Sequence, residues 1–560
     1  MYEGSTTVEE KLERLKKEVL ELAIPAEPIE NHPEYDPEKH ELIKRELINI
    51  LGEKYVSDEP WVTQAYSRDY TTIYDQMRPE FVALPGSVED VQAIVRLANR
   101  LKFAVIPVGT SLSSTCKAKG PCTVILDLAK RMKRIIKIDA KNMYAIVEPG
   151  VTYAQLHAEA IKRGLTHHGA PSSGSQSKII ANNVGMAAVN AKGYRYGIGP
   201  DNILALEIVL PNGEILWIGS AAMPNAGYFW GEGPGPDLRG LVTGKGSYGS
   251  MGIVTKLAYK LHPWPGPSTW PAEGYLPHIK TKLPEDKHRP YLIKFPNYRK
   301  LVDALYEIGK CEVGYAIHAL TPHQIAGWYC RSNKQFYQLY FKERYFHKWA
   351  PTLFVHLVAL TSKRQLEYEE KVLKQIIKEY DGEFIPSDEI AQDFLETAGI
   401  EWGYADVHGC RTMRYTGTYA PLMGSQGPLD LLYEVGRKDS WQMQIRDKYH
   451  PPLVDVVPYD AILWPMEFCH WGNQEQSVFP EKAPEKFKIS VQAREELIRE
   501  TLKRNDPNAV QGLFTSEETI NLITKIKNAF DPANIANPPL PMSFFEEYKK
   551  VKEKLGAKKD

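Results

Sequence analysis

Residues 196–214 read YGIGPDNILALEIVLPNGE, and they join two apolar runs through a short polar segment. The runs are Ile203–Leu210 and Glu214–Ile218, and the segment between them is Pro211-Asn212-Gly213. An Asn-Gly step between apolar runs is a strong hairpin signal, because a type I′ turn needs positive φ at both of its central residues. The sequence therefore predicts two antiparallel strands joined by a type I′ turn.

The chain on both sides of this hairpin alternates between short apolar runs and amphipathic segments. We expect helices at Val88–Arg100 and Tyr153–Arg163. We expect strands at Phe81–Leu84, Phe103–Pro107, Cys122–Leu128 and Tyr144–Val147. Three prolines, Pro263, Pro265 and Pro267, then mark a boundary, and the pattern beyond them is mixed α and β to about residue 505. A chain of 560 residues has room for two or three such domains.

Four loops of the first half are rich in Gly, Ser and Pro, and each is attached to a strand or a helix. Small residues let the backbone approach a diphosphate closely, and N–H groups and hydroxyls can donate to the anion. Any one such loop is more often a plain turn. Neither the GxGxxG nor the GxxxxGK nucleotide pattern is present. The four loops are Pro107–Ser114, Val147–Tyr153, Ala170–Ser175 running into Asn182-Asn183, and Gly246–Thr255.

In their order and context these loops resemble the FAD-binding domain of one flavoprotein family. That family includes vanillyl-alcohol oxidase, p-cresol methylhydroxylase, glycolate oxidase and D-lactate dehydrogenase. The resemblance covers residues 38–265, and its most specific pieces are VEPGVTY, YGIGPDNILALEIVLPNGE and GSYGSMGIVT. A distant piece, IKNAFDPANIANP at 526–538, is similar to the family's closing helix and turn. The resemblance implies an α+β fold with a two-part FAD-binding domain of the p-cresol methylhydroxylase type and a mixed α/β cap.

The resemblance also implies a division of the chain into four parts. Residues 1–37 would be a helix and linker, 38–265 the FAD-binding domain, and 266–505 the substrate cap. Residues 506–560 would return a C-terminal helix to the FAD-binding domain and end in a tail. Residues 6–23 have the apolar spacing of an amphipathic helix, which either packs on its own domain or docks on a partner.

Within the family the first and third loops hold the diphosphate, and the residues around Ile253 lie along the flavin. The chain departs from the family in having Val108 for a common Arg, and Tyr248 for a common acidic residue. Residues 107–116 contain no His, so we expect the flavin to be held noncovalently. The residues matched to the cofactor are Gly109, Thr110, Ser111, Leu112, Ser113, Pro171, Ser172, Ser173, Ser177, Asn182, Gly246, Gly252, Ile253 and Asn537.

The segment Glu467–Asn473, EFCHWGN, is similar to the FGHxGDGNxH segment of the hydroxy-acid dehydrogenases, whose histidines bind a divalent metal. His470 matches the first histidine, but Ser477 stands at the second and the later acidic ligand is not found. One histidine is a poor zinc site, so we expect no metal. A histidine side chain can serve as the base that takes a hydroxyl proton near neutral pH, so His470 is a candidate for this role. The alternative is a hydrogen-bonded structural histidine.

Two arginines three residues apart lie in HGCRTMRYTG. Arg411 and Arg414, with Tyr415 beside them, can grip a substrate carboxylate through bidentate hydrogen bonds. The commoner fate of such a pair is a solvated surface or a structural ion pair. We therefore hold both interpretations open for this segment.

Three functions follow from the resemblance. The first is a dehydrogenase that passes hydride from a small alcohol or hydroxy acid to flavin N5, with electrons leaving to an external carrier. The second is an oxidase or hydroxylase of alkylphenols. The third is a flavin-binding subunit of a larger redox complex. The partners would be a small-molecule substrate, an electron-transfer protein or iron–sulfur subunit, and a second copy of the chain.

Composition excludes several other classes. The net charge is −1 and the pI is near 7.0, which gives no electrostatic reason for binding nucleic acid or a membrane surface. The six cysteines form no CxxC pair, so no zinc ribbon or iron–sulfur ligand set is expected. The polar N-terminus does not resemble a signal peptide, and no apolar run has the length of a membrane span. These features predict a cytoplasmic protein.

Overall fold

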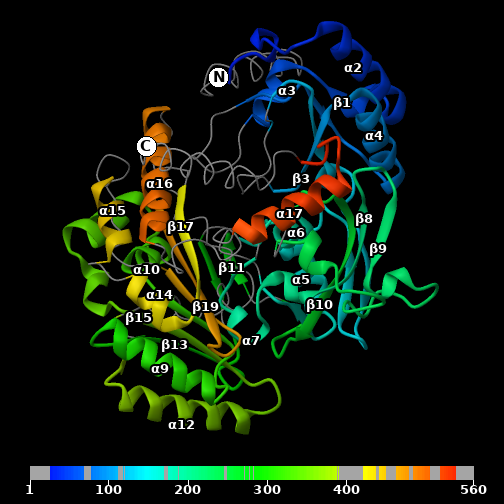
Figure 1. Ribbon diagram of the computed structural model, residues 1–560. Helices are drawn as coiled ribbons and strands as arrows, with labels where there is room; N and C mark the ends of the chain where they lie inside the picture. Colours follow the sequence, from blue (N-terminus) through cyan, green and yellow to red (C-terminus); the bar gives the residue numbers. More distant parts are fainter. Residues whose placement is uncertain are drawn as a thin grey trace, which may run out of the picture.

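A computed structural model gives the fold of the chain (Figure 1). It describes residues 26–67, 77–110, 118, 120–169, 174–186, 188–244, 249–269, 272–275, 278–281, 283–386, 389, 420–436, 440–449, 462–478, 484–504 and 517–537. The helix expected at 6–23 and the tail expected at 544–560 lie outside these residues. The described part contains three main sheets, and the C-terminal helix packs beside the first two (Figure 1).

The first sheet has four strands in the order β1-β2-β4-β3. Helix α4 (Val88–Leu101) packs its apolar face on this sheet. It begins at Ser87, whose hydroxyl accepts from the N–H of Asp90, a normal N-cap, and its C-cap, Lys102, is left-handed. Because β2, β4 and β3 run parallel, the loop after β3 leaves from the carboxyl edge of the sheet. The strands are β1 (Val56–Ser57), β2 (Phe81–Ala83), β3 (Ala104–Val108) and β4 (Thr123–Asp127).

The second sheet has the order β5-β6-β10-β8-β9, with β7 also paired to β10. Its long central strand is β10 (Ile253–Pro263), and the helix α5 (Tyr153–Ile161) begins with a capping box at Thr152. The neighbouring helices are α6 (Ile179–Val184) and α7 (Gly193–Tyr196). The other strands are β5 (Ile135–Asp139), β6 (Tyr144–Val147), β7 (Leu165–His167), β8 (Ile203–Val209) and β9 (Ile215–Ile218).

The hairpin expected at 203–218 is confirmed as β8 paired antiparallel with β9, but the expected turn type is wrong. Only Gly213 has a positive φ, of 84°. Pro211 and Asn212 are the central residues of the turn, and the ring of Pro211 fixes its φ near −65°, which a mirror-image turn does not allow at that position. The N–H of Gly213 donates to Leu210 O at 2.8 Å, and the N–H of Leu210 donates to Glu214 O at 2.8 Å. These bonds fit a three-residue loop that ends in a left-handed glycine.

The third sheet forms the cap, in the order β16-β13-β15-β14-β18-β19-β17. On one face α9 (Tyr298–Lys310), α12 (Lys363–Glu379) and α14 (Leu429–Gly436) cover an apolar surface (Figure 1). The other face meets α10 (Pro322–Tyr329), α15 (Trp441–Lys448) and α16 (Pro484–Arg504). The strands are β13 (His288–Lys294), β14 (Ala316–Leu320), β15 (Thr352–Val358), β16 (Glu383–Phe384), β17 (Ala420–Gly427), β18 (Ile462–Met466) and β19 (Trp471–Val478).

Shorter elements connect these layers. Helix α3 (Pro60–Ala65) follows β1, α8 (Arg239–Val242) precedes β10, and α11 (Asn333–Phe336) lies in the cap. A separate hairpin pairs β11 (Ala272–Tyr275) with β12 (His278–Thr281). Near the C-terminus α17 (Glu517–Phe530) returns to lie beside α6 and β3 (Figure 1).

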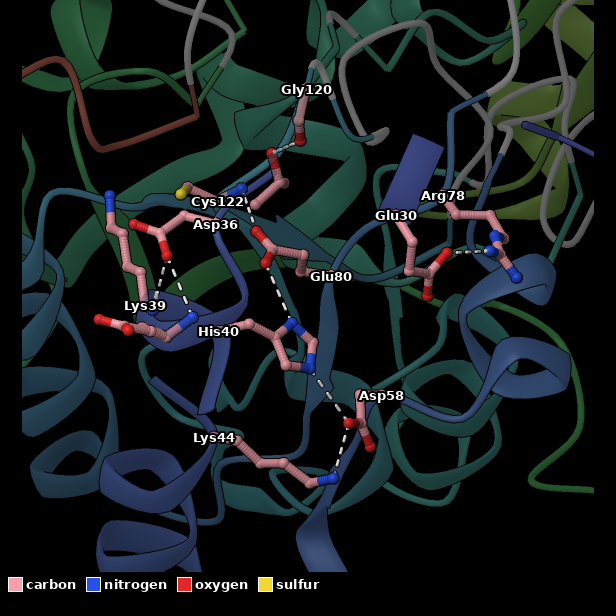
Figure 2. Close-up of polar contacts among 12 residues, drawn as sticks. Glu30, Asp36, Lys39, His40, Lys44, Asp58, Arg78, Glu80, Gly120 and Cys122 are labelled. Carbon is pink, nitrogen blue, oxygen red and sulfur yellow. Dashed lines mark hydrogen bonds and ion pairs between the residues drawn. The ribbon is translucent and has the colours of Figure 1, made fainter. Parts of the chain in front are cut away.

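A charged network ties α2 (Pro37–Leu51) to the first sheet (Figure 2). His40 is buried, with Nδ1 3.0 Å from Glu80 Oε1 and Nε2 3.2 Å from Asp58 Oδ2. Lys44 donates to the same Asp58 oxygen at 2.7 Å, and the N–H of Cys122 donates to Glu80. Burial lowers the pKa of His40, but the bonds to Glu80 and Asp58 outweigh it, so the pKa is raised.

The His40 network predicts a pH dependence of stability. Because the folded pKa of His40 is raised, its contribution is fully present below an unfolded pKa of about 6.5 and is lost as the pH rises through the folded value. We expect His40→Gln to lower the free energy of unfolding by about 1.5–3 kcal/mol at acidic pH and by less in alkali. Urea unfolding across the pH range measures this. The exposed His470→Gln is the control, and an equal loss at every pH would contradict the prediction.

Candidate FAD-binding site

The structure describes eight of the residues singled out from the sequence. They are Gly109, Thr110, Ser177, Asn182, Gly252, Ile253, Asn537 and His470. The remaining ten lie outside the described residues, so their positions stay predictions. These are Ser111, Leu112, Ser113, Pro171, Ser172, Ser173, Gly246, Arg411, Arg414 and Tyr415.

The first loop and helix α6 are in direct contact. The N–H of Lys178 donates to Thr110 Oγ1 at 2.9 Å, just before α6 begins. A Cβ placed on Gly109 would lie 2.6 Å from the Cβ of Ala181 on α6. Glycine is therefore required at 109 because the backbone of the loop lies against the helix, and the sequence alone cannot indicate which residue it approaches.

The contact between Gly109 and Ala181 gives a testable pair. We expect Gly109→Ala to weaken FAD binding roughly tenfold or more, because the added methyl displaces the loop or α6. The double variant Gly109→Ala/Ala181→Gly removes the clash and should recover most of the affinity, with Ala181→Gly as the reference. Fluorescence titration of apoprotein with FAD gives the dissociation constants. Equal affinities for Gly109→Ala and the double variant would contradict the explanation.

The fourth loop reaches the same place. The N–H of Gly244 donates to Asn183 O on α6 at 3.0 Å. A Cβ on Gly249 would lie 3.8 Å from Val184 Cγ1 and 3.9 Å from Asn537 Nδ2. Gly252 has a φ of +144°, and the buried Ile253 then starts β10. Three segments therefore meet around one point, namely the loop that precedes β10, helix α6 and the C-terminal turn.

The C-terminal turn is bonded to β3, the strand that leads into the first loop. The N–H of Val105 donates to Ile535 O at 2.7 Å, and the N–H of Asn537 donates to Val105 O at 2.8 Å. Lys527 on α17 donates to Ser250 O at 2.8 Å, to Ala536 O at 2.7 Å and to Asp531 Oδ2 at 2.5 Å. A buried ammonium group thus connects the helix, the fourth loop and the turn. Nothing in the spacing of the sequence singled out Lys527.

These loops fit FAD by their chemistry. Asn182 is buried on α6, and no described residue donates to its Oδ1. A buried acceptor without a partner is uncommon in a native protein and is explained when a ligand supplies the donor. The hydroxyl of Thr110 lies beside the start of α6, and small residues at 109 and 249 let the backbone of both loops come close to this helix. The donors, the free acceptor and the small residues match a dinucleotide with hydroxyl groups and a diphosphate.

The segment 191–195 joins the FAD loops to the cap. The N–H of Ile317 donates to Ala191 O at 3.0 Å, and the N–H groups of Glu467 and Phe468 donate to Gly193 O and Tyr194 O at 3.0 and 2.6 Å. Strand β14 and the β18–β19 turn are thereby fixed against the first half of the chain. The inner face of the cap sheet, defined by His318, Trp464, Asn473 and Glu475, faces away from α9 and α12.

A buried polar cluster lies at the same junction, and sequence analysis missed it. Lys192 is fully buried, and its Nζ donates to His167 O at 2.5 Å. Burial lowers the pKa of the Lys192 ammonium well below its usual range. Tyr196 stacks on His262 with ring centroids 3.7 Å apart and meets Tyr315 of the cap edge-on. A sequence signal did exist, since Lys192 immediately precedes the GYRYG that starts the family-like stretch.

His470 lies in the turn between β18 and β19 and is exposed. The three residues before it, Glu467, Phe468 and Cys469, all have positive φ. The turn therefore reverses the chain sharply, and it carries His470 to the surface rather than to the inner face of the cap. This position does not favour the role of a base in an enclosed site.

Glu475, five residues further on, lies on the inner face of the cap. It is opposite Ile462, next to the pair formed by Trp464 and Asn473. Burial raises the pKa of the Glu475 carboxyl to about 7, although a hydrogen bond from Asn473 opposes the shift. Gln426 donates to Asn473 Oδ1 at 3.3 Å and so orients this amide. A carboxyl group with a pKa near neutrality can hold or release a proton at physiological pH.

No group of three or more His, Cys, Asp or Glu side chains in the described parts of the chain is arranged to hold a metal ion. No helix of the described ranges is both long and apolar enough to cross a membrane.

Comparison with known proteins agrees with an FAD-binding site formed by these loops and helix α6. Residues 79–219 match the FAD binding domain family. Glycolate oxidase subunit GlcD of Bacillus subtilis (strain 168) is 30% identical over 227 residues, which are 40% of this chain and 45% of that protein. D-lactate dehydrogenase of Anaerostipes hadrus is 32% identical over 213 residues, 38% of this chain and 42% of that protein. The chain thus matches less than half of the length of these relatives.

The fold extends further than the sequence match. The structure of p-cresol methylhydroxylase with substrate bound superposes with a TM-score of 0.70 at 19% identity, covering 90% of this chain and 97% of that one. The expected fold class is therefore confirmed over the FAD-binding domain and the cap together.

Proposed function

We propose that this chain, in which residues 79–219 are an FAD-binding domain, is an FAD-dependent dehydrogenase of a small alcohol or hydroxy acid. The observation that carries the proposal is the inner face of the cap, where Glu475 has a pKa near neutrality and is oriented by Asn473. The names of the relatives, glycolate oxidase and D-lactate dehydrogenase, support a hydroxy acid.

The protein residues would act in binding and in proton transfer. When bound, FAD supplies a two-electron acceptor for hydride. The first loop, α6 and the C-terminal turn would hold the cofactor through Thr110, Asn182 and backbone N–H groups. The Glu475 carboxylate takes the proton of the substrate hydroxyl as the carbon–hydrogen bond breaks, so that an alcohol becomes a carbonyl compound. Asn473 and Gln426 keep the carboxylate in place.

A second candidate is the oxidation of an alkylphenol. It is favoured by the aromatic residues Tyr196 and Tyr315, whose rings meet edge-on at the junction of the two halves. We also propose that electrons pass to an external carrier, either a small electron-transfer protein or an iron–sulfur partner subunit.

Anaerobic flavin reduction tests these proposals. Purified protein should be yellow, with an absorbance band near ~450 nm. The panel contains hydroxy acids, benzylic alcohols and alkylphenols, and bleaching by a hydroxy acid or simple alcohol supports the first proposal. Bleaching by para-alkylphenols alone supports the second. A coloured protein that is purified with a partner and that none of these compounds bleaches supports a flavin-binding subunit. A protein that binds no FAD would contradict all of these proposals.

A further inference from the structure

Lys178 brings a positive charge to the point where the first loop meets α6. Its backbone N–H donates to Thr110 Oγ1 at 2.9 Å, and a Cβ added to Gly109 would lie 3.7 Å from the Cβ of Lys178. The N–H of Asn182 donates to Lys178 O at 3.0 Å, which places Asn182 one helical turn further along. The acceptor Asn182 Oδ1, which has no donor among the described residues, and the Lys178 side chain therefore belong to the same end of the first loop.

The ammonium group of Lys178 is not committed to an acidic residue. It is half-buried, and in the described part of the chain it forms no ion pair. Lys527, the other cation beside these loops, is instead bonded to Asp531 at 2.5 Å. Of these two cations, Lys178 is the one whose charge can meet an anionic ligand.

Asp127 is the acidic residue whose charge acts on Lys178, but its oxygens are already in use. It ends β4, in register with Val108 at the end of β3. Asp127 Oδ2 accepts from Tyr66 Oη at 2.7 Å, and Oδ1 accepts from the N–H of Ala129 at 3.1 Å. Burial lowers the pKa of Lys178, and the charge of Asp127 only partly opposes this shift. An anion that came closer would therefore stabilise the ammonium form of Lys178.

We infer that the ammonium group of Lys178 binds the diphosphate of FAD. Backbone N–H groups and the hydroxyl of Thr110 can donate to phosphate oxygens, but they carry no net charge, whereas a lysine adds a positive point charge. Gly109 has no side chain to separate the loop backbone from α6, so an anion bound to the loop lies within reach of Lys178. This inference rests on FAD as the cofactor in the proposed function, and it does not depend on the substrate.

Titration of the full-length apoprotein with FAD, followed by fluorescence, tests the inference. Lys178→Met should raise the dissociation constant roughly 10- to 100-fold, because a hydrogen bond between charged groups is lost. Lys178→Arg keeps the charge and should stay close to wild type, whereas Lys178→Glu should bind FAD more weakly than Lys178→Met does. Lys162→Met is the matched control, because Lys162 is exposed at the far end of α5 and bonded to Glu159. Melting temperatures of the apoproteins show that each variant is folded.

Two further measurements separate an effect of charge from an effect of packing. Added salt should weaken FAD binding more steeply in wild type than in Lys178→Met, because salt screens the contact that the variant lacks. ADP has the diphosphate without the flavin, so it should compete with FAD in wild type and compete less well in Lys178→Met.

Equal dissociation constants for wild type and Lys178→Met would overturn the inference. So would an equal loss of affinity in the Met, Arg and Glu variants, because such a loss follows from packing and not from charge. A wild-type apoprotein that binds no FAD would overturn both this inference and the proposed function. Normal FAD binding with no flavin bleaching by any compound of the panel would contradict the proposed dehydrogenase alone.

Discussion

Replacing Lys527 by methionine should lower the free energy of unfolding by about 3–5 kcal/mol and release FAD. The substitution leaves the Asp531 carboxylate buried without its cation, and breaking one side of a buried pair has this cost. It also removes the donor to Ser250 O and Ala536 O, which fixes the fourth loop and the C-terminal turn. Denaturant unfolding and the ratio of flavin to protein absorbance measure the two effects.

Lys525→Met is the matched control, because Lys525 lies on the same helix and is exposed. The double variant Lys527→Met/Asp531→Asn should recover part of the stability, since the buried charge is removed while the amide oxygen still accepts from one of the two N–H groups, of Ile535 and Ala536, that bond to the two carboxylate oxygens. If Lys527→Met behaved as Lys525→Met does, the helix would not be held to the FAD loops through this ammonium group.

Local pattern was sufficient for many elements of the fold. The helices expected at Val88–Arg100 and Tyr153–Arg163 appear as Val88–Leu101 and Tyr153–Ile161. Their caps and apolar periodicity are short-range features, and a sequence displays these directly. The turn at Pro211–Gly213 was misjudged for a local reason as well, because the Asn-Gly signal was weighed without the φ of the preceding proline.

The site depended on contacts that the sequence does not display. Gly109 and Ala181 are 72 residues apart, and Lys527 meets Ser250 across 277 residues. No spacing rule connects such positions. His470 was chosen because it matches a family motif, yet three left-handed residues in succession turn it outward. Glu475 was not among the expected catalytic residues, and its raised pKa comes from its burial on β19, which pairs with β18.

The role proposed for Glu475 predicts a change in the pH profile. The carboxylate form accepts the proton, so kcat of the wild-type protein should rise with pH to a plateau above about 7. We expect Glu475→Gln to lower kcat by about 10²–10⁴-fold and to abolish this rise, because an amide cannot take the proton. Glu475→Asp should keep the rise at a reduced rate. The substrate is the one that bleaches the flavin most rapidly in the anaerobic panel.

Stability gives a readout that does not depend on activity. Because the folded pKa of Glu475 is raised, the folded state binds this proton more tightly than the unfolded state, and stability falls as the pH rises from about 4.5 through about 7. Glu475→Gln lacks this fall, so the variant should be more stable than wild type by about 1–3 kcal/mol at alkaline pH and similar to it in acid. FAD content should not change. If His470→Gln rather than Glu475→Gln removed the rise in kcat, the exposed histidine would be the proton acceptor, and the assignment to Glu475 would be wrong.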